Sequence, residues 1–460
     1  MPRVLSGTYI TKKYVLHTSD DMNHNSICRL DYTIRHIFTI YKQENRIGGN
    51  RNIMIIDKKR SLLALIALAV SAFAIGTTEF ISVGLLPLIA EDMNISVTTA
   101  GLTVSMYALG VTFGAPILTS LTSRMSRKTL LLWIMIIFII GNSLAASSAS
   151  IGVLLAARVL SAFSHGVFMS IGSIIAASVV PENRRASAIS IMFTGLTVAT
   201  VTGVPLGTFI GQQLGWRLAF VAIVAVGIVA LIANSILVPS DLPKGERTSF
   251  RDQAKLMTNG RLLLMLLITA LGYGGTFVVF TYLSPLLQDI TGFNENTVAV
   301  ILLVYGIAIA VGNVIGGKAA NRNPLKALLY MFIAQALVLV TLTFTAPFQT
   351  AGLITIILMG FLAFMNVPGL QVYVVMLAER FAPGAVNMAS ALNIAAFNAG
   401  IAIGAFLGGL ITNSMGLIHT AWIGSLMVAG AVVLTGWSLK LERKDSENPD
   451  KSDKPDMPAA

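Results

Sequence analysis

Apolar runs of about 20 residues recur along the chain between residues 61 and 439, and short polar segments separate them. A helix needs about 20 apolar residues to cross the roughly 30 Å hydrocarbon core of a bilayer. The runs are continuous and do not alternate with polar positions, which favours helices over the strands of a β-barrel. We therefore predict an all-α membrane protein with twelve transmembrane helices. The predicted spans are 61–83, 99–119, 130–148, 151–178, 187–209, 217–238, 262–288, 297–317, 325–345, 351–377, 386–411 and 419–439.

The composition agrees with this pattern. Of the 460 residues, 55% are hydrophobic and 12% are charged, whereas soluble proteins carry about 25% charged residues. So few charges cannot cover a water-facing surface. The formal net charge of +11 needs a separate explanation.

That explanation comes from where the basic residues stand. Lys and Arg concentrate in the connections after even-numbered spans and in the two flanking segments, whereas Arg217 is the sole basic residue of the odd-numbered connections. Glu91, Asp92, Asp289 and Glu295 lie in those odd-numbered connections. By the positive-inside rule, this pattern predicts an even number of spans and places both termini in the cytoplasm. The positive charge thus indicates topology and contact with the lipid bilayer, and no nucleic-acid partner.

The chain divides into five segments. Residues 1–53 contain the single cysteine, Cys28, and no apolar run. They are either a cytoplasmic tail or the product of a start codon assigned too early, with a native start at Met54, and we expect disorder in both cases. The charged connection 239–261 separates two six-helix halves, residues 54–238 and 262–439. Residues 440–460 form a polar tail that we expect to be disordered.

The two halves show a weak internal repeat. The first span ends in Gly84-Leu85-Leu86-Pro87, and the seventh ends in Tyr282-Leu283-Ser284-Pro285. Repeats of this kind are typical of transporters with a central cavity between two related halves.

Two spans carry glycines at steps of four. Gly203, Gly207 and Gly211 accompany Pro205 in the fifth span, and Gly404 and Gly408 lie in the eleventh. Residues four apart share one helix face, where missing side chains let a neighbouring backbone approach. The stripes indicate either ordinary helix packing or an interface at which these two helices meet and rock against each other.

Three ionisable residues lie deep within predicted spans: Glu79, Arg158 and His165. Each charge costs about 2.5–3.5 kcal/mol at a helix centre, so such residues are functional candidates. Arg158 retains its proton, whereas His165 titrates near neutrality. Glu79 is a candidate for proton coupling or solute contact, with a structural ion pair as the alternative. Arg158 is expected to stabilise a conformation or to bind solute, and His165 to join a proton network or to make a satisfied helix contact.

Polar residues of the second half are neutral. They are Tyr273, Thr276, Tyr282, Asn366, Gln371, Asn393 and Asn398. A cavity lined by such side chains suits a neutral or weakly polar small molecule, through hydrogen bonds and apolar contact. No phosphate-binding loop, His/Cys metal cluster or nucleophilic triad is recognisable in the sequence. We therefore expect that the protein is not an enzyme and binds no cofactor. We expect a proton gradient to be its energy source.

Several motifs resemble those of a known family. They are Glu79-Phe80 before Gly84-Leu85-Leu86-Pro87, Tyr107-Ala108-Leu109-Gly110, Arg158 with Phe163, His165 and Gly166, and Gly203-Val204-Pro205-Leu206-Gly207 before Gly215-Trp216-Arg217. The chain resembles the drug:proton antiporter branch of the major facilitator superfamily, and within it the bacterial arabinose and sugar efflux permeases and chloramphenicol-resistance transporters. After the second span it keeps Arg124, Arg127 and Lys128 of the family loop, but has Thr119, Ser123 and Ser126 where Gly and Asp are usual.

The resemblance implies a monomeric, multi-pass protein of the bacterial inner membrane that exports small organic solutes in exchange for protons. Arabinose and chloramphenicol exemplify the two solute classes that it suggests. A proton symporter for uptake of a neutral solute and a non-transporting membrane receptor are the alternatives. A receptor of this kind would be expected to carry a folded output domain, and the terminal segments are too short and polar to form one.

Overall fold

The computed structural model describes residues 58–122, 125–181, 185–240, 242, 256, 258–320, 323–382 and 386–447, and these ranges contain helices and no strand. The helices up to residue 237 are α2 (Lys58–Asp92), α3 (Val97–Leu121), α4 (Arg127–Ala146), α5 (Ile151–Ser178), α6 (Arg185–Leu214) and α7 (Trp216–Leu237). The later helices are α9 (Gly260–Phe280), α10 (Leu283–Pro285), the π-helix η2 (Leu286–Ile290), α11 (Glu295–Ala320), α12 (Pro324–Thr345), α13 (Gln349–Ala363), α14 (Val367–Phe381), α15 (Val386–Ser414) and α16 (His419–Glu447).

Twelve segments of the described chain are long and apolar enough to cross a membrane, with α13 and α14 together forming one of them. The predicted all-α membrane fold with twelve spans is therefore confirmed. The predicted extension 1–53 and most of the predicted connection 239–261 lie outside the described residues.

Two predicted spans are interrupted. The seventh, predicted as one helix over 262–288, ends as α9 at Phe280 and resumes as α10 and η2 around Pro285. The tenth, predicted over 351–377, breaks between α13 and α14 at residues 364–366. Pro368 lies in the first turn of α14, where a missing N–H is tolerated. Each break lies in the turn that precedes a proline, whose ring disfavours a continuous helix there.

Two helices run far past their predicted ends. Helix α2 continues from residue 83 to Asp92 because Leu85, Leu86 and Ile89 are fully buried. Helix α16 continues from residue 439 to Glu447, so the tail predicted from residue 440 begins as a helix. Leu441 packs against the hydrophobic core, and its carbonyl accepts a hydrogen bond from Arg261 Nη2 at 3.2 Å.

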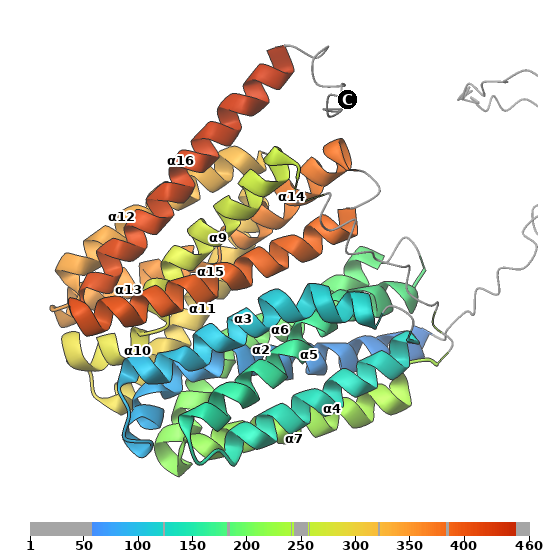
Figure 1. Ribbon diagram of the computed structural model, residues 1–460, viewed down its shortest axis with the longest axis horizontal. Coiled ribbons are helices and arrows are strands. Elements are labelled where there is room, and N and C mark those ends of the chain that lie inside the picture. Colours follow the sequence, from blue (N-terminus) through green and yellow to red (C-terminus); the bar gives the residue numbers. More distant parts are fainter. Residues whose placement is uncertain are drawn as a thin grey trace, which may run out of the picture. The chain divides into compact units, whose positions relative to one another are not determined.

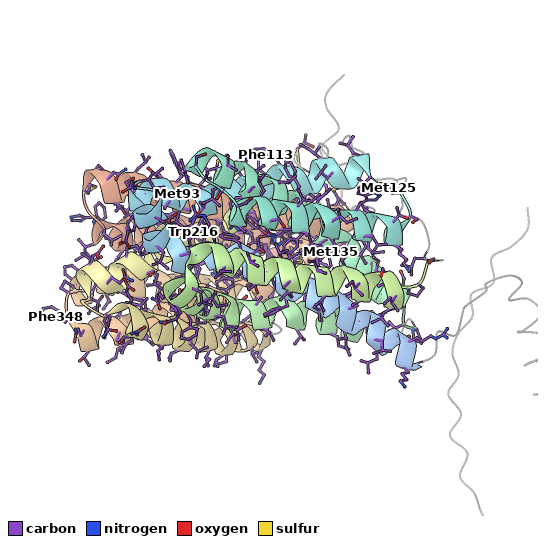
Figure 2. All side chains as sticks on the ribbon, turned by 90° about the horizontal axis from the view of Figure 1, so that it is seen from below. Met93, Phe113, Met125, Met135, Trp216 and Phe348 are labelled. Atoms are coloured by element: carbon purple, nitrogen blue, oxygen red, sulfur yellow. The ribbon has the colours of Figure 1, made fainter. Side chains whose placement is uncertain are left out.

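The outward-facing side chains are largely apolar (Figure 2). Phe113 and Phe348 are 61% and 66% exposed, whereas Met135 and Trp216 are buried. Soluble monomers rarely expose large continuous apolar surfaces. This surface suits contact with lipid, in agreement with the lengths of the helices.

Most closely packed helix pairs lie within α2–α7 or within α9–α16 (Figure 1). In the first set α2 packs on α6 and α7, and α4 packs on α5 and α7. In the second set α9 packs on α15 and α16, and α12 packs on α13 and α16. The buried apolar side chains accordingly form two main clusters, one drawn mostly from each set. The main contacts between the sets are α3 with α15, α6 with α11, and α2 with α10.

Each glycine stripe packs against the first long helix of its own set. In α6, Gly203 faces Thr77, Gly207 faces Ile81 and Gly211 faces Leu85, all of which lie on α2. The hypothesis that the fifth and eleventh spans meet through these stripes is therefore wrong. Glycines on one face let a neighbouring helix approach closely, but their spacing does not show which helix that is.

The eleventh span makes the same kind of contact. Gly400, Gly404 and Gly408 on α15 face the carbonyl oxygens of Ala270, Gly274 and Val278 on α9. The alternative of ordinary helix packing accounts for both stripes.

We expect Gly404→Ala to lower the thermal unfolding temperature of the purified protein, because the added Cβ would overlap the Gly274 carbonyl of α9. Overpacking between two backbones costs about 1–3 kcal/mol. The matched control is Gly436→Ala on α16, where an added Cβ meets nothing within 4 Å. Circular dichroism in detergent measures both, and equal unfolding temperatures for the two variants would contradict the close approach of α15 and α9.

Candidate functional site

Arg158 on α5 is completely buried and reaches across to two neighbouring helices. Its Nη1 donates to the Thr78 carbonyl at 2.7 Å, its Nε to the Thr103 carbonyl at 3.3 Å, and its Nη2 to the Glu79 carbonyl at 3.4 Å. A guanidinium group presents donors in a fixed fork, so one side chain can serve carbonyls of both α2 and α3. Arg158 therefore ties together α2, α3 and α5.

Tyr107 on α3 joins Arg158 to His165. The Arg158 Cζ lies 4.2 Å from the centre of the Tyr107 ring, a cation–π contact. The Tyr107 hydroxyl shares a hydrogen bond with His165 Nδ1, at 3.2 Å. Arg158 and His165, two turns apart on α5, thus meet the same ring. Tyr107 stands in one of the family motifs of the sequence but was not predicted as a site residue.

Glu79 is partly exposed, and its carboxylate is not the acceptor that holds Arg158. Within the described ranges no ion pair joins these two side chains within 4.0 Å, because the guanidinium donates to backbone carbonyls instead. The two charges still act on each other electrostatically, and Glu79 also acts on Tyr107 and Tyr273. A change in the charge of the Glu79 carboxylate therefore acts electrostatically on residues of both sets of helices.

A chain of buried amides lies in the second set. Gln335 on α12 donates through Nε2 to Thr276 Oγ1 on α9. Its Oε1 accepts from Asn366 Nδ2 at 3.1 Å, at the break between α13 and α14. The Asn366 Oδ1 is buried and has no hydrogen-bond partner. Gln335 was not predicted, although it is a polar residue in the middle of an apolar run.

A second chain of polar side chains connects α9, α15 and α14. Thr269 Oγ1 donates to Asn393 Oδ1 at 2.7 Å, and Asn393 Nδ2 donates to Gln371 Oε1 at 2.9 Å. Gln371 Nε2 in turn donates to Ser390 Oγ. These amides satisfy one another, as buried polar groups must.

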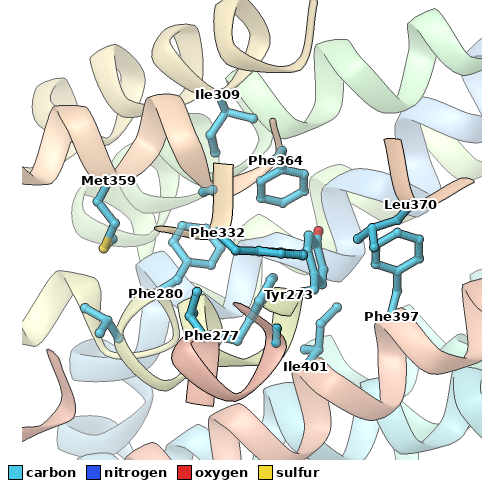
Figure 3. Close-up of a cluster of buried hydrophobic side chains, with 14 of the residues drawn as sticks. Tyr273, Phe277, Phe280, Ile309, Phe332, Met359, Phe364, Leu370, Phe397 and Ile401 are labelled. Atoms are coloured by element: carbon cyan, nitrogen blue, oxygen red, sulfur yellow. The ribbon is translucent and has the colours of Figure 1, made fainter. Parts of the chain in front are cut away.

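Aromatic rings of the second set gather around Tyr273 (Figure 3). Tyr273 contacts Phe277, Phe364 and Phe397, with ring centroids 4.9–5.2 Å apart. Phe80, which follows Glu79, contacts Phe280 and Phe364 edge-on at 6.4 and 5.8 Å. We call these rings, together with Tyr305, which stacks on Phe280, the aromatic cluster. It joins the segment of α2 that carries Glu79 to the helices that carry the amide chains.

The predicted neutral residues therefore separate into groups. Tyr273 belongs to the aromatic cluster, Thr276 and Asn366 to the first amide chain, and Gln371 and Asn393 to the second. Asn398 donates to the Ile394 carbonyl of its own helix, and its Oδ1 is buried without a partner. Tyr282 lies elsewhere, against α3 and α15.

The structure describes only part of the predicted basic loop after the second span. Arg124 lies outside the described residues. Arg127 Nη1 donates to Ser178 Oγ on α5 at 3.1 Å, and Lys128 Nζ donates to the Ser235 carbonyl on α7 at 2.8 Å. Both residues thus connect α4 to helices of the same set.

The opposite end of the bundle carries the acidic connections. Asp92 Oδ2 accepts hydrogen bonds from Arg217 Nη1 at 2.6 Å and Trp216 Nε1 at 3.1 Å. Arg217 also donates to the Ser148 carbonyl at 3.0 Å, so it joins the ends of α2, α4 and α7. Within η2, burial raises the pKa of Asp289 above its usual range.

Comparison with known proteins gives consistent matches. The family model described as Major Facilitator Superfamily matches residues 68–380. The chain is 77% identical over 394 residues to the MFS-type transporter YtbD of Bacillus subtilis (strain 168), covering 86% of this chain and 100% of that protein. It is 36% identical over 377 residues to the inner membrane transport protein YdhP of Escherichia coli (strain K12), covering 82% and 96%. It is 31% identical over 356 residues to AraJ of the same strain, covering 77% and 89%.

YtbD and YdhP are described as transport proteins and not as enzymes. The resemblance inferred from the sequence motifs is thereby confirmed.

We expect Arg158→Lys to lower the thermal unfolding temperature, although the charge is kept. An ammonium group cannot reach carbonyls of α2 and α3 together or lie flat on Tyr107, and each hydrogen bond lost by the buried charge costs about 1.5–3 kcal/mol. Arg217→Lys is the matched control, since its pair with Asp92 is 38% and 44% exposed and such pairs contribute about 0–1 kcal/mol. Equal losses in the two variants, measured by circular dichroism in detergent, would argue against the bridging role of Arg158.

Proposed function

Because the chain belongs to the major facilitator superfamily, we propose that it is a proton-coupled secondary transporter that exports small, uncharged organic solutes. The observation that carries this proposal is the position of Glu79. Glu79 is a partly exposed residue beside the aromatic cluster, and its carboxylate makes no ion pair with Arg158 in the described chain. A carboxylate in such a place can gain and lose a proton without breaking a salt bridge.

Arg158 supplies a fixed charge next to this variable one. Its guanidinium is held by three backbone carbonyls and by the Tyr107 ring, so its position does not depend on whether Glu79 is ionised. Proton binding at Glu79 then changes the net charge near the aromatic cluster. We propose that this change favours one conformation of the transporter, and that Arg158 and His165 position the helices around it.

The proposed solute is uncharged. The side chains of both amide chains and of the aromatic cluster are neutral, so they offer hydrogen bonds and apolar contact but no counter-ion. Asn366 Oδ1 and the Tyr305 hydroxyl are buried without partners and are free to bind a solute that carries hydroxyl or amide groups. A sugar such as arabinose or a drug such as chloramphenicol fits this description.

We propose that residues 54–238 and 262–439 form two related halves that alternate access to the solute. Several pairings recur in both sets: α2 with α6 corresponds to α9 with α15, and α4 with α7 corresponds to α12 with α16. The contacts between the sets, α3 with α15 and α6 with α11, exchange with each other if a twofold axis relates the halves. These correspondences support a repeat about the membrane normal.

We further propose that both termini are cytoplasmic and that the protein is a monomer in the bacterial inner membrane. Lys128 and Lys326 lie at one end of the helices, whereas Asp92 and Asp289 lie at the other. The basic end is assigned to the cytoplasm by the positive-inside rule.

The decisive experiment measures solute entry into inverted membrane vesicles whose lumen has been acidified. We expect labelled arabinose or chloramphenicol to accumulate while the pH gradient lasts, because protons leaving the lumen drive the solute in. Glu79→Gln should abolish gradient-driven accumulation, since an amide cannot exchange a proton. The matched control is Glu91→Gln on the same helix, whose carboxylate is exposed at the helix end and which should transport normally.

Two outcomes would contradict this function. Accumulation that is independent of the gradient in both the wild type and Glu79→Gln would exclude proton coupling through Glu79. Solute that accumulates in intact cells in place of leaving them would identify a symporter.

A further inference from the structure

Tyr282 lies at the break between α9 and α10 and is 1% exposed. Its hydroxyl donates a hydrogen bond to the Ala405 carbonyl of α15 at 3.2 Å. The residue belongs to the second set of helices, yet its side chain packs with the apolar cluster of the first. Tyr282 is therefore a point of contact between the sets, and it does not belong to the aromatic cluster.

The ring occupies a slot whose walls are backbone. Gly101 on α3 and Gly408 and Gly409 on α15 surround it. A Cβ on Gly101 would lie 2.7 Å from Tyr282 Cζ and closer still to the hydroxyl. A Cβ on Gly408 would lie 2.9 Å from Cε2, and one on Gly409 would lie 2.7 Å from the hydroxyl. The phenol fits only because all three positions lack side chains.

The two sides of the slot belong to different sets of helices. Gly408, Gly409 and the acceptor Ala405 lie on α15, in the same set as Tyr282, whereas Gly101 lies on α3. Neighbouring hydrogen bonds also cross between the sets. Thr98 Oγ1 donates to Asn413 Oδ1 at 2.9 Å, and Gln212 Nε2 donates to the Glu295 carbonyl at 2.9 Å. These contacts lie toward the end that carries the acidic connections.

We propose that Tyr282 is a positioning residue that holds this end of the transporter closed by inserting between α3 and α15. The hydrogen bond to Ala405 keeps the phenol on α15, so opening of this end withdraws Gly101 from the ring. The Tyr282–Gly101 contact thereby sets the balance between the closed and open conformations of this end. This proposal rests on the alternating access of the proposed function, but it concerns a contact distinct from the proton and solute sites.

The test measures a distance across this end by electron–electron double resonance. Spin labels are placed through Glu91→Cys and Ser414→Cys, at exposed ends of α2 and α15, in a Cys28→Ser background of the full chain. The Gly101→Ala variant should raise the ratio of long to short distances about tenfold, because the added methyl overlaps the phenol only in the closed conformation. Gly436→Ala, whose added Cβ meets nothing within 4 Å, is the matched control and should leave the distribution unchanged.

A second variant isolates the Tyr282 contact from general helix packing. In a Tyr282→Ala background the added methyl of Gly101→Ala has room, so it should cause no further shift in the distances. An equal shift in both backgrounds, or no shift in either, would overturn the proposal. If Gly101→Ala alone does not yield folded protein, recovery of folding in Gly101→Ala/Tyr282→Ala supports the contact, and failure of recovery overturns it.

The measurement needs neither a solute nor a pH gradient. The role of Tyr282 can therefore fail while proton-coupled export holds. Export can equally fail while the distances respond to Gly101→Ala as expected.

Discussion

The buried charge of Arg158 is the constraint on which the arrangement of the first set depends. A guanidinium group keeps its proton, so a fully buried one must find acceptors within the protein. It finds them in the carbonyls of Thr78, Glu79 and Thr103, and in the face of Tyr107. Three helices are held together in this way, and the carboxylate of Glu79 remains outside the ion pair that the sequence would suggest.

Much of the fold could be predicted from the sequence because the bilayer imposes a length and a polarity on every span. Twelve apolar runs correspond to twelve membrane-length segments. The ends of the helices and the breaks within two spans could not be predicted in the same way. The breaks near Pro285 and Pro368 depend on local backbone geometry, and the extension of α2 to Asp92 depends on burial of Leu85 and Leu86 by other helices.

The candidate site could be predicted only in part, for a related reason. Glu79, Arg158 and His165 are conspicuous because charge is rare within apolar runs. Tyr107 and Gln335 are ordinary in sequence and become informative only through partners on other helices, His165 in one case and Asn366 in the other. The glycine stripes likewise predicted close contact with another helix, but their spacing could not show which helix. The tertiary fold places α2 and α9 there.

The packing of those stripes has a mechanical consequence. Where α15 meets α9, the glycines lie directly against carbonyl oxygens, and where α6 meets α2, the Ile81 and Leu85 side chains fill the spaces left by Gly207 and Gly211. Such closely packed contacts resist sliding of one helix past the other, because any shift would bring atoms into overlap. The pair α2 and α6 and the pair α9 and α15 should therefore each move as one rigid body. Any large relative motion within the bundle must then be taken up elsewhere, where α3 meets α15 and α6 meets α11.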